Sequence, residues 1–181
     1  MKLIKYSFFI LLFSFMPVRA QNNSFSFTQS GLTKFIIQEF KDVKQKELYE
    51  KTMSWLNLNK QKSKIQLNET KKNEFICFEE VKSKVLCDKY LEDLNCYDIR
   101  STILISFNNN SYKFEVVKME ILIQTNTEKK WMDFSIEADH QNKYFKKNGM
   151  INARYKMYPS TIETIFNSFN ENLKNYILNS H

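Results

Sequence analysis

The stretch KQKELYEKTMSWLNLN (residues 44–59) decides how the chain is organised. Its apolar and uncharged side chains recur at three- and four-residue spacing, which places them on one stripe of a 3.6-residue helix: Leu48, Tyr49, Thr52, Met53, Trp55 and Leu56. Charged residues occupy the opposite side, and Glu47 precedes Lys51 by one helical turn in the favourable order. A lone helix of this length is marginal in water, so we expect it to pack on strands that flank it.

The N-terminus has the features of a signal peptide, predicted over residues 1–20. Lys2 and Lys5 precede an uncharged apolar run at residues 6–16, and Val18 and Ala20 occupy the small-residue positions before a cut. We expect cleavage between Ala20 and Gln21 and export to the periplasm or the medium. The apolar run is short for a bilayer span, so an uncleaved anchor is the lesser alternative, and no transmembrane segment is expected after cleavage.

Charge patterning argues against nucleic acid as a partner. Loss of the signal peptide would lower the formal net charge from +7 to +4. The remaining basic residues alternate with acidic ones, as in KKNEF (residues 71–75) and NTEKKW (residues 126–131), which is typical of a solvated face. The 16 Phe, 9 Tyr and 2 Trp indicate a sheet faced with aromatic rings.

Five segments have the alternation or the β-branched and aromatic content of strands: residues 33–40, 64–69, 74–81, 97–107 and 111–124. The last two flank Asn108, Asn109 and Asn110, which favour a tight hairpin turn. The apolar phase of the return strand changes once, and a bulge near Val116 and Val117 would reconcile its two halves. Residues 82–95 show little pattern and are expected to form a loop with a short strand at residues 85–87.

A second helix is predicted from residue 160 to the C-terminus. Its apolar residues follow the helical period: Ile162, Ile165, Phe166, Phe169, Leu173, Tyr176 and Ile177. Ser160 and Glu163 have the spacing of a capping box, and Asp42 is a plausible N-cap for the first helix. Between the last strand and this helix, residues 125–159 are polar, and within them Trp131, Phe134, Ile136, Tyr144 and Phe145 could cover a sheet edge.

The order strand, helix, four strands, helix predicts an α+β protein with an antiparallel sheet. Residues 21–32 form a lead-in, and residues 33–181 form one domain.

The segments FIIQEF (35–40), ELYEKTMSWL (47–56) and KIQLNETKKNEFICFEE (64–80) carry a resemblance. They are similar to a secreted bacterial domain of unknown function with a TBP-like fold, named after the TATA-box-binding protein. The similarity extends to the hairpin that ends near Ile123, and the C-terminal helix is compatible with it. The resemblance implies this fold and an exported, Gram-negative setting. It implies no activity, and a fold name alone implies no DNA binding.

Residues suited to catalysis or metal binding are scarce. Only two glycines are present, Gly31 and Gly149, so a glycine-rich phosphate loop is excluded. His140 and His181 are the only histidines, and Asp139 beside His140 is weak support for a metal site. The adjacent acidic pairs Glu79–Glu80 and Glu92–Asp93 are interpreted as surface charges. We therefore predict no enzyme, no cofactor and no metal site.

Three cysteines remain in a compartment where disulfides persist. The preferred bridge joins Cys87 to Cys96, because both lie in or beside the poorly patterned segment 82–95. Cys77 then stays a buried free thiol between Ile76 and Phe78. A Cys77–Cys87 bridge is the chief rival, and three free thiols are the other alternative.

Two functions from different classes remain. The first is an exported, non-enzymatic binding or accessory domain that acts through an unknown protein or cell-envelope partner. The second is a carrier that holds a small apolar ligand between the curved sheet and the C-terminal helix, near Phe107, Tyr112, Phe114 and Phe166. A filled core favours the first function, whereas a cavity of roughly several hundred Å³ favours the second.

Overall fold

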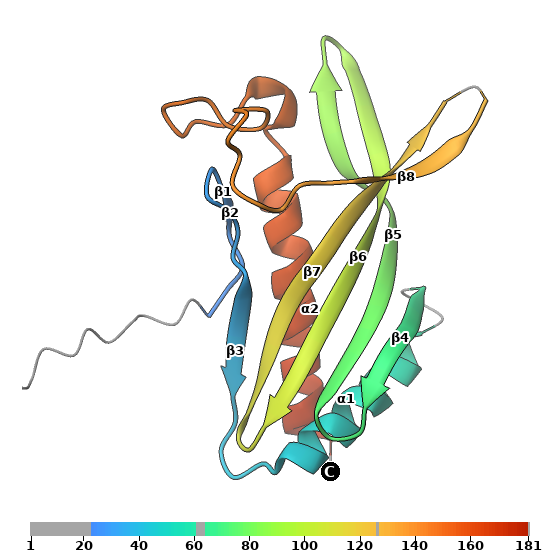
Figure 1. Cartoon of the computed structure of the whole chain (residues 1–181), viewed down its shortest axis with the longest axis vertical. Coiled ribbons are helices and arrows are strands. Elements are labelled where there is room, and N and C mark those ends of the chain that lie inside the picture. The colour runs from blue at the N-terminus through green and yellow to red at the C-terminus, as the bar shows by residue number, and fades with distance from the viewer. Residues whose placement is uncertain (1–22, 61–63, 126, 181) are drawn as a thin grey trace, which may run out of the picture.

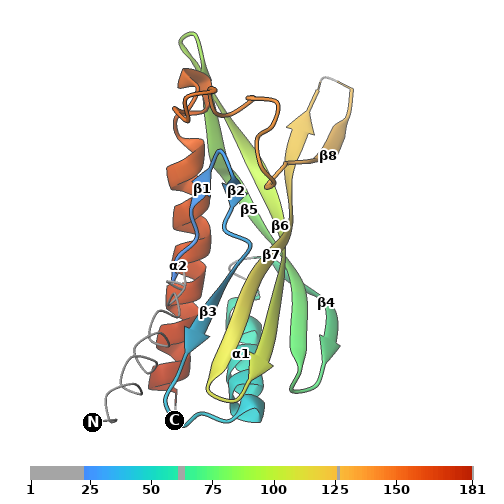
Figure 2. The ribbon, with the colours of Figure 1, turned by 60° about the vertical axis from the view of Figure 1, so that its left-hand side comes forward.

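Antiparallel strands form one sheet, and both helices pack on the same face of it (Figures 1 and 2). The computed structural model describes residues 23–60, 64–125 and 127–180. Its elements are β1 (Phe27–Thr28), β2 (Gly31–Leu32), β3 (Phe35–Glu39), α1 (Gln45–Asn59), β4 (Ile65–Lys71), β5 (Phe75–Tyr90), β6 (Asp93–Asn108), β7 (Ser111–Gln124), β8 (Lys129–Asp133), the 3₁₀ turn η1 (Ala153–Tyr155) and α2 (Tyr158–Asn179). The predicted α+β class, with its antiparallel sheet and long C-terminal helix, is confirmed.

The strands of the sheet follow the order β3-β7-β6-β5-β4. Strand β3 pairs with the first part of β7, as far as Glu115, and β8 pairs with the last part, from Glu120 onward. The short β1–β2 ribbon is separate and lies beside α2 (Figure 2). The predicted bulge is confirmed, because Val116 faces Ile103 and Lys118 faces Thr102, which leaves Val117 without an opposite residue. Asn110 closes the β6–β7 turn with φ of +64°.

The helix stripes are placed as the sequence predicts. Leu48, Trp55 and Leu56 of α1 are buried, and Glu47 pairs with Lys51 at 3.0 Å. In α2, five of the seven predicted stripe residues are buried: Ile162, Phe166, Phe169, Leu173 and Ile177.

Aromatic rings fill the space between α2 and the sheet. The ring of Phe169 lies 4.8 Å from Trp55, 5.6 Å from Phe78 and 5.3 Å from Phe114, measured between centroids. Phe166 is fully buried beside them. Rings at these separations are in packing contact, so side chains occupy the interface where the carrier hypothesis places a ligand.

Residues 23–32, expected to lead into the domain, contribute to this core. Phe25 is 2% exposed, and its ring lies 5.1 Å from Phe114 and 5.7 Å from Phe166. The Asn167 amide of α2 accepts a hydrogen bond from the backbone N–H of Phe25 and donates one to its carbonyl. At Gly31, with φ of +92°, a Cβ would meet the Ile136 carbonyl oxygen at 2.6 Å, so glycine is required there.

The short strand predicted at residues 85–87 lies within β5, but the loop predicted to follow it is wrong. Strands β5 and β6 continue through it as a hairpin that pairs as far as Tyr90 and Asp93. The register shifts between Lys82 and Leu86, and Lys84 has φ of +53°. This irregularity breaks the alternation, and beyond it the consecutive residues Leu86, Cys87 and Asp88 are all buried, so the sequence there shows no period of two.

Both predicted helix caps are also wrong. Asp42 lies in the connection with φ of +56°, and α1 begins after Lys44 without a side-chain cap. Helix α2 begins at Tyr158 with Pro159 in its first turn. Glu163 instead accepts a hydrogen bond from the Phe27 N–H at 2.9 Å, so a tertiary contact replaces the local one.

The predicted signal peptide and the cleavage site between Ala20 and Gln21 lie outside the described residues. Within the described ranges, no helix is both long enough and apolar enough to cross a membrane. Export therefore stays a prediction.

Candidate functional site

The segment between β8 and α2 (residues 134–157), which we call the crossing segment, passes over the upper part of the sheet as drawn in Figure 1. Its course is fixed by backbone hydrogen bonds, from Phe134 to the Met119 carbonyl and from Leu32 to the Ile136 carbonyl. The Asp139 carboxylate accepts the N–H groups of Lys143, Tyr144 and Phe145 at 2.7–2.9 Å. Burial opposes ionisation of Asp139, but these three donors hold its pKa below the usual value. The carboxylate thereby holds residues 139–145 in a closed loop.

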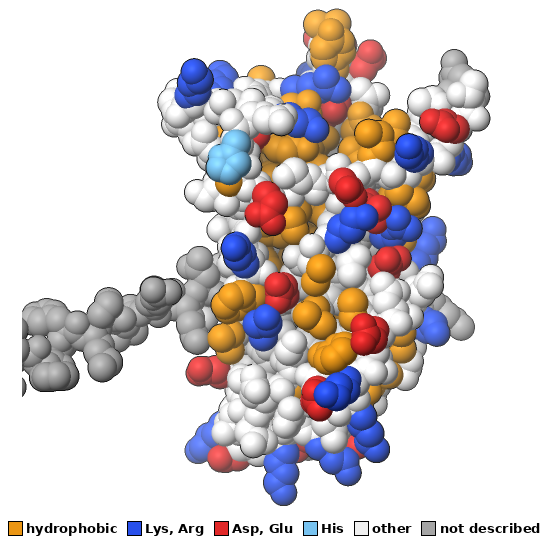
Figure 3. Space-filling model, in the orientation of Figure 1, with side chains coloured by type: hydrophobic (Ala, Val, Ile, Leu, Met, Phe, Trp, Pro, Cys, Tyr) orange, Lys and Arg blue, Asp and Glu red, His pale blue; other side chains and the backbone are white. Residues whose placement is uncertain are grey.

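A hollow of about 170 Å³ lies under this crossing segment, and we call it the aromatic pocket. It is lined by Asp88, Tyr97, Ile121, Ile123, Phe134, Lys143, Tyr144, Arg154, Tyr155 and Tyr158. Strands β5, β6 and β7 supply the first four residues, and the crossing segment, η1 and α2 supply the others. Figure 3 shows hydrophobic side chains gathered in the upper part of the face, with Lys and Arg above them.

The rings of the aromatic pocket pack on one another. The centroids of Phe134 and Tyr144 are 5.1 Å apart, those of Tyr144 and Tyr155 5.2 Å, and those of Tyr155 and Tyr158 5.1 Å. Burial raises the pKa of Tyr144 to about 12. Burial, reinforced by the nearby Asp88 carboxylate, also raises the pKa of Tyr158. At neutral pH these phenols are therefore protonated hydrogen-bond donors.

An ion pair between the buried Asp88 and the exposed Arg154 forms the polar part of the pocket. Asp88 is 2% exposed. Its Oδ2 accepts hydrogen bonds from Arg154 Nε at 3.2 Å and Nη2 at 3.1 Å. The Tyr97 hydroxyl lies 3.4 Å from the same oxygen. Its Oδ1 is buried with no hydrogen-bond partner. The Arg154 guanidinium lies 5.2 Å from the ring of Tyr90 and 5.4 Å from that of Tyr155, within cation–π range.

A disulfide precedes Asp88 in β5. Cys87 and Cys96 are opposite each other in the β5–β6 register, with Cα atoms 4.0 Å apart, and their sulfurs are joined. Cys77 is a free, half-buried thiol that faces Leu104 rather than Cys87. The crosslink joins the two strands near the tip of the hairpin, directly before Asp88, and thereby fixes the strand position from which Asp88 enters the pocket.

The disulfide has a direct chemical test. We expect non-reducing peptide mapping of the purified protein to yield one peptide that links Cys87 to Cys96, with Cys77 alkylated. In the chain-entropy model, closing this ~10-residue loop stabilises by up to ~3 kcal/mol. A linked Cys77 peptide, or three alkylated thiols, would refute the pairing.

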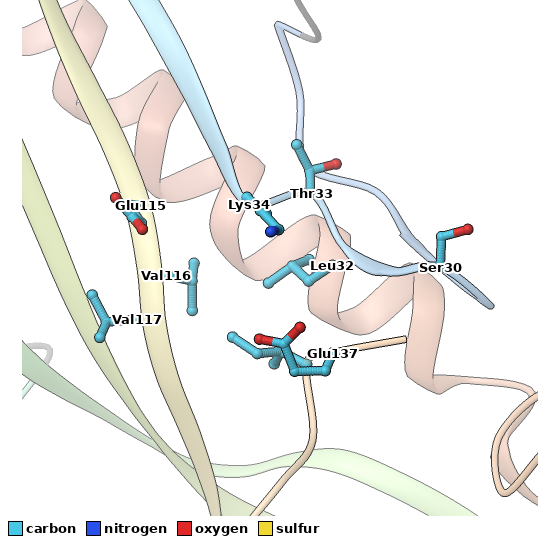
Figure 4. Close-up of a pocket in the computed structure, with 9 residues that line it drawn as sticks. Ser30, Leu32, Thr33, Lys34, Glu115, Val116, Val117 and Glu137 are labelled. Atoms are coloured by element: carbon cyan, nitrogen blue, oxygen red, sulfur yellow. The ribbon is translucent and has the colours of Figure 1, made fainter. Parts of the chain in front are cut away.

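Figure 4 shows a second hollow, of about 250 Å³, at the edge of β7 between the start of β3 and the end of β8. Lys34 and Glu137 lie on one side of it, and Glu115 and Val117 of β7 on the other. None of its nine lining residues carries a buried polar atom without a partner. The aromatic pocket is therefore the better candidate for a binding site.

One of the predicted surface carboxylates is not on the surface. Glu79 is half-buried, and Glu92 and Asp93 are exposed, but Glu80 is only 3% exposed and pairs with Lys82 at 3.0 Å. Glu80 has the parity of the buried Ile76 and Phe78, so its side chain points to the core face of β5. Burial raises its pKa, and Lys82 opposes this only in part.

Glu80 should make the folded state more stable as pH falls from 7 toward 5. A carboxyl whose pKa is higher in the folded protein contributes stability that is present below its unfolded pKa, ordinarily 4.5, and lost as pH rises through the folded pKa. We expect Glu80→Gln to reduce this pH dependence and Glu79→Gln to leave it unchanged, as measured by urea denaturation at the two pH values. An unchanged dependence in Glu80→Gln would show that this carboxyl does not cause it.

The residues that the sequence offered for metal binding do not come together as metal ligands in the described part of the chain. The Asp139 carboxylate is occupied by backbone donors, and His140 is exposed. His181 lies outside the described residues. Across the part of the chain that the structure describes, no three His, Cys, Asp or Glu side chains are grouped to hold a metal ion.

Ion pairs lie within β7 and between β6 and β7. Lys113 pairs with Glu115 at 2.6 Å, and Glu120 accepts from Arg100 at 2.7 Å and from Lys118 at 3.0 Å. Figure 3 shows acidic and basic side chains interspersed over the face. On this part of the sheet, such pairing leaves little unbalanced positive charge for a phosphate backbone.

Two solved structures resemble the chain over most of its length. A TBP-like protein from Parabacteroides distasonis superposes with a TM-score of 0.54 and 12% sequence identity, over 81% of this chain and 92% of that protein. A DUF4468 family protein from Bacteroides ovatus superposes with a TM-score of 0.62 and 11% identity, over 88% of this chain and 93% of that protein. No protein-family model and no curated protein matches the chain.

At this level of identity the likeness shows the fold alone. The chain has a TBP-like α+β fold, which confirms the resemblance predicted from the sequence at the level of the fold. The likeness defines no activity, so function has to be argued from this chain's own residues.

Proposed function

We propose that this protein is an exported, non-enzymatic binding module that holds a protein or cell-envelope partner through the aromatic pocket. The observation that carries this proposal is the buried Asp88 carboxylate, whose Oδ1 has no partner in the fold. Burying a charge is costly unless hydrogen bonds satisfy it. Stable folds rarely leave such groups unpaired, and the exceptions concentrate at functional sites.

The surroundings of Asp88 suit recognition. Tyr97 and Tyr155 are half-buried, so each retains exposed surface beside the pocket. Lys143 and Arg154 add donors to the lining. Tyrosine and arginine beside a desolvated pocket are the residue types that dominate binding energy at protein interfaces.

The filled interface under α2 favours this function over the carrier of a small apolar ligand. Phe166 and Phe169 occupy that space. The aromatic pocket, at about 170 Å³, is also smaller than the roughly 300–1,000 Å³ of ordinary small-molecule sites. Its size suits a single anchoring side chain or a small headgroup.

Three further features support a role without catalysis, cofactor or nucleic acid. The phenols near Asp88 have raised pKa values, which suits donors rather than general bases at neutral pH. His140 is exposed, away from the residues that line the pocket. The balanced ion pairs on the sheet offer no basic stripe to a nucleic acid.

Affinity capture from the native envelope tests the function. Tagged mature protein is compared with Tyr155→Ala, which opens the pocket wall, and with Tyr176→Ala, an equally half-buried tyrosine of α2 outside the pocket. We expect mass spectrometry to find one partner retained by the wild type and Tyr176→Ala but lost by Tyr155→Ala. Equal capture by all three proteins would contradict binding through the pocket.

Export has a separate test. The basic start, the apolar run and the small residues Val18 and Ala20 lead us to expect a mature N-terminus at Gln21. Edman sequencing should begin there, or be blocked if the glutamine has cyclised. Protein that keeps Met1 and stays in the cytoplasm would refute the localisation and weaken the redox argument for the disulfide.

A further inference from the structure

We infer that the aromatic pocket also receives the tip of the β5–β6 hairpin of a second copy of this chain, which forms a two-fold symmetric dimer. This inference rests on the proposed function in that it uses the same pocket as a binding site.

The hairpin tip has the form of an apolar anchor. Strands β5 and β6 extend past their neighbours and form the upper extremity of the molecule (Figures 1 and 2). Leu91 is 78% exposed, Leu94 58% and Tyr90 56%. A scattered exposed leucine needs no explanation, but three large apolar side chains at one protruding turn mark an interaction site.

The pocket matches this anchor in size and chemistry. Its volume is about 170 Å³, and its walls are mostly aromatic and aliphatic. A protein cavity of about 150 Å³ accommodates a benzene molecule, so the pocket has room for one leucine side chain. The chain cannot insert its own Leu91, because the disulfide between Cys87 and Cys96 holds the hairpin closed and extended.

Charge supports the same pairing. Glu92 and Asp93 are exposed beside Leu91, and the only ion pair at the tip, among the described residues, is the loose 3.9 Å contact of Lys89 with Glu92. The pocket lining contains Lys143, and also Arg154, whose charge is paired with that of Asp88. The same crossing segment also exposes three further lysines: Lys146, Lys147 and Lys156. An acidic, apolar tip therefore complements a basic, apolar pocket, and such complementarity fixes register and speeds association.

Symmetry selects a closed dimer. The tip and the crossing segment lie at the same end of the molecule (Figures 1 and 2). A two-fold axis through that end places each tip at the partner's pocket, so both contacts form at once. Had the two surfaces been at opposite ends, the contact would have propagated into an open chain.

Sedimentation velocity of the mature protein tests the dimer. We expect the wild type to dimerise, Leu91→Ser to be monomeric, and Leu58→Ser to dimerise like the wild type, since Leu58 is 66% exposed on α1 at the other end. Added salt should weaken the dimer. A wild type that is monomeric up to about 100 µM, or equal effects of Leu91→Ser and Leu58→Ser, would overturn the inference.

Charge reversal tests the pairing of tip and pocket. One variant carries Glu92→Lys and Asp93→Lys, and the other carries Lys143→Glu and Lys146→Glu; all four positions are exposed, so folding should be unaffected. We expect each variant alone to be monomeric. A mixture should form heterodimers, because each tip then meets a pocket of opposite charge. Failure of the mixture to associate would overturn the inference.

The inference and the proposed function fail separately. Leu91→Ser leaves the pocket intact, so it should lose the dimer and capture at least as much envelope partner as the wild type. Tyr155→Ala should lose both. If the wild type is monomeric but Tyr155→Ala loses the envelope partner, the dimer is refuted and the function stands. If the dimer forms but capture is unaffected by Tyr155→Ala, the dimer stands and the function is refuted.

Discussion

Replacing Phe166 with alanine should lower the free energy of unfolding by about 3–5 kcal/mol, the range for a buried phenylalanine. Phe166 is fully buried, with its ring 5.7 Å from that of Phe25. The variant would leave a cavity between α2 and the β1–β2 region that these rigid neighbours fill only in part. Urea denaturation of the variant and the wild type measures the difference.

The matched control is Asn172→Ala on the exposed side of α2, which should change stability by less than ~0.5 kcal/mol. Asn167 has the helical position of a solvent-facing residue, but it is unsuitable as a control because its amide hydrogen-bonds to the backbone of Phe25. Equal losses in Phe166→Ala and Asn172→Ala would show that the buried face of α2 is misassigned.

Replacing Arg154 with methionine should destabilise the protein by about 2–3 kcal/mol, because it leaves a buried carboxylate without its charged donors. Asp88 is 2% exposed, and both hydrogen bonds from the guanidinium go to its Oδ2. The double variant with Asp88→Asn removes the unpaired charge and should recover part of the loss. Urea denaturation of the single and double variants completes a double-mutant cycle.

Additive losses in that cycle would contradict the ion pair. A surface pair of this kind would contribute at most about 1 kcal/mol, so a loss below that value in the Arg154 variant would show that Asp88 is well hydrated. Asp88 would then not be a desolvated charge, and the aromatic pocket would lose the feature that marks it as a binding site.

The fold could be predicted where burial imposes a period on the sequence. The alternation from Ile99 to Phe107 identifies β6 because its core-facing residues are buried. The change of phase at Val117 predicts a bulge because one residue shifts every later side chain to the other face. The stripe from Ile162 to Ile177 identifies α2 for the same reason.

The aromatic pocket could not be predicted, because its residues meet only in three dimensions. Asp88 and Tyr97 belong to the hairpin extension, where a register shift and three consecutive buried residues, 86–88, remove the alternation of a strand. Arg154 comes from a segment without periodicity, yet it reaches Asp88 from 66 residues away. Tyr144 and Phe145 were predicted to cover a sheet edge, and they are buried residues of the crossing segment. The density of tyrosine and lysine in residues 143–158 was the available signal.

The wrong capping box has a tertiary cause. Ser160 and Glu163 satisfy the local spacing rule, but Glu163 lies opposite β1 and binds the Phe27 N–H. Likewise, Glu80 follows the sequence pattern of a surface charge and is buried because the parity of β5 turns it toward the core. A local sequence pattern predicts the conformation that is most stable for that segment alone. Contacts with distant segments can stabilise a different conformation.

Photo-crosslinking in the native envelope is the most direct test of the pocket as a binding site. A photoreactive phenylalanine analogue replaces Tyr155 in one protein and Tyr176 in another, two half-buried tyrosines at different ends of the molecule. We predict that irradiation attaches an envelope component, in addition to a second copy, through position 155 and neither through position 176. Equal crosslinking at both positions, or none at position 155, would contradict the account.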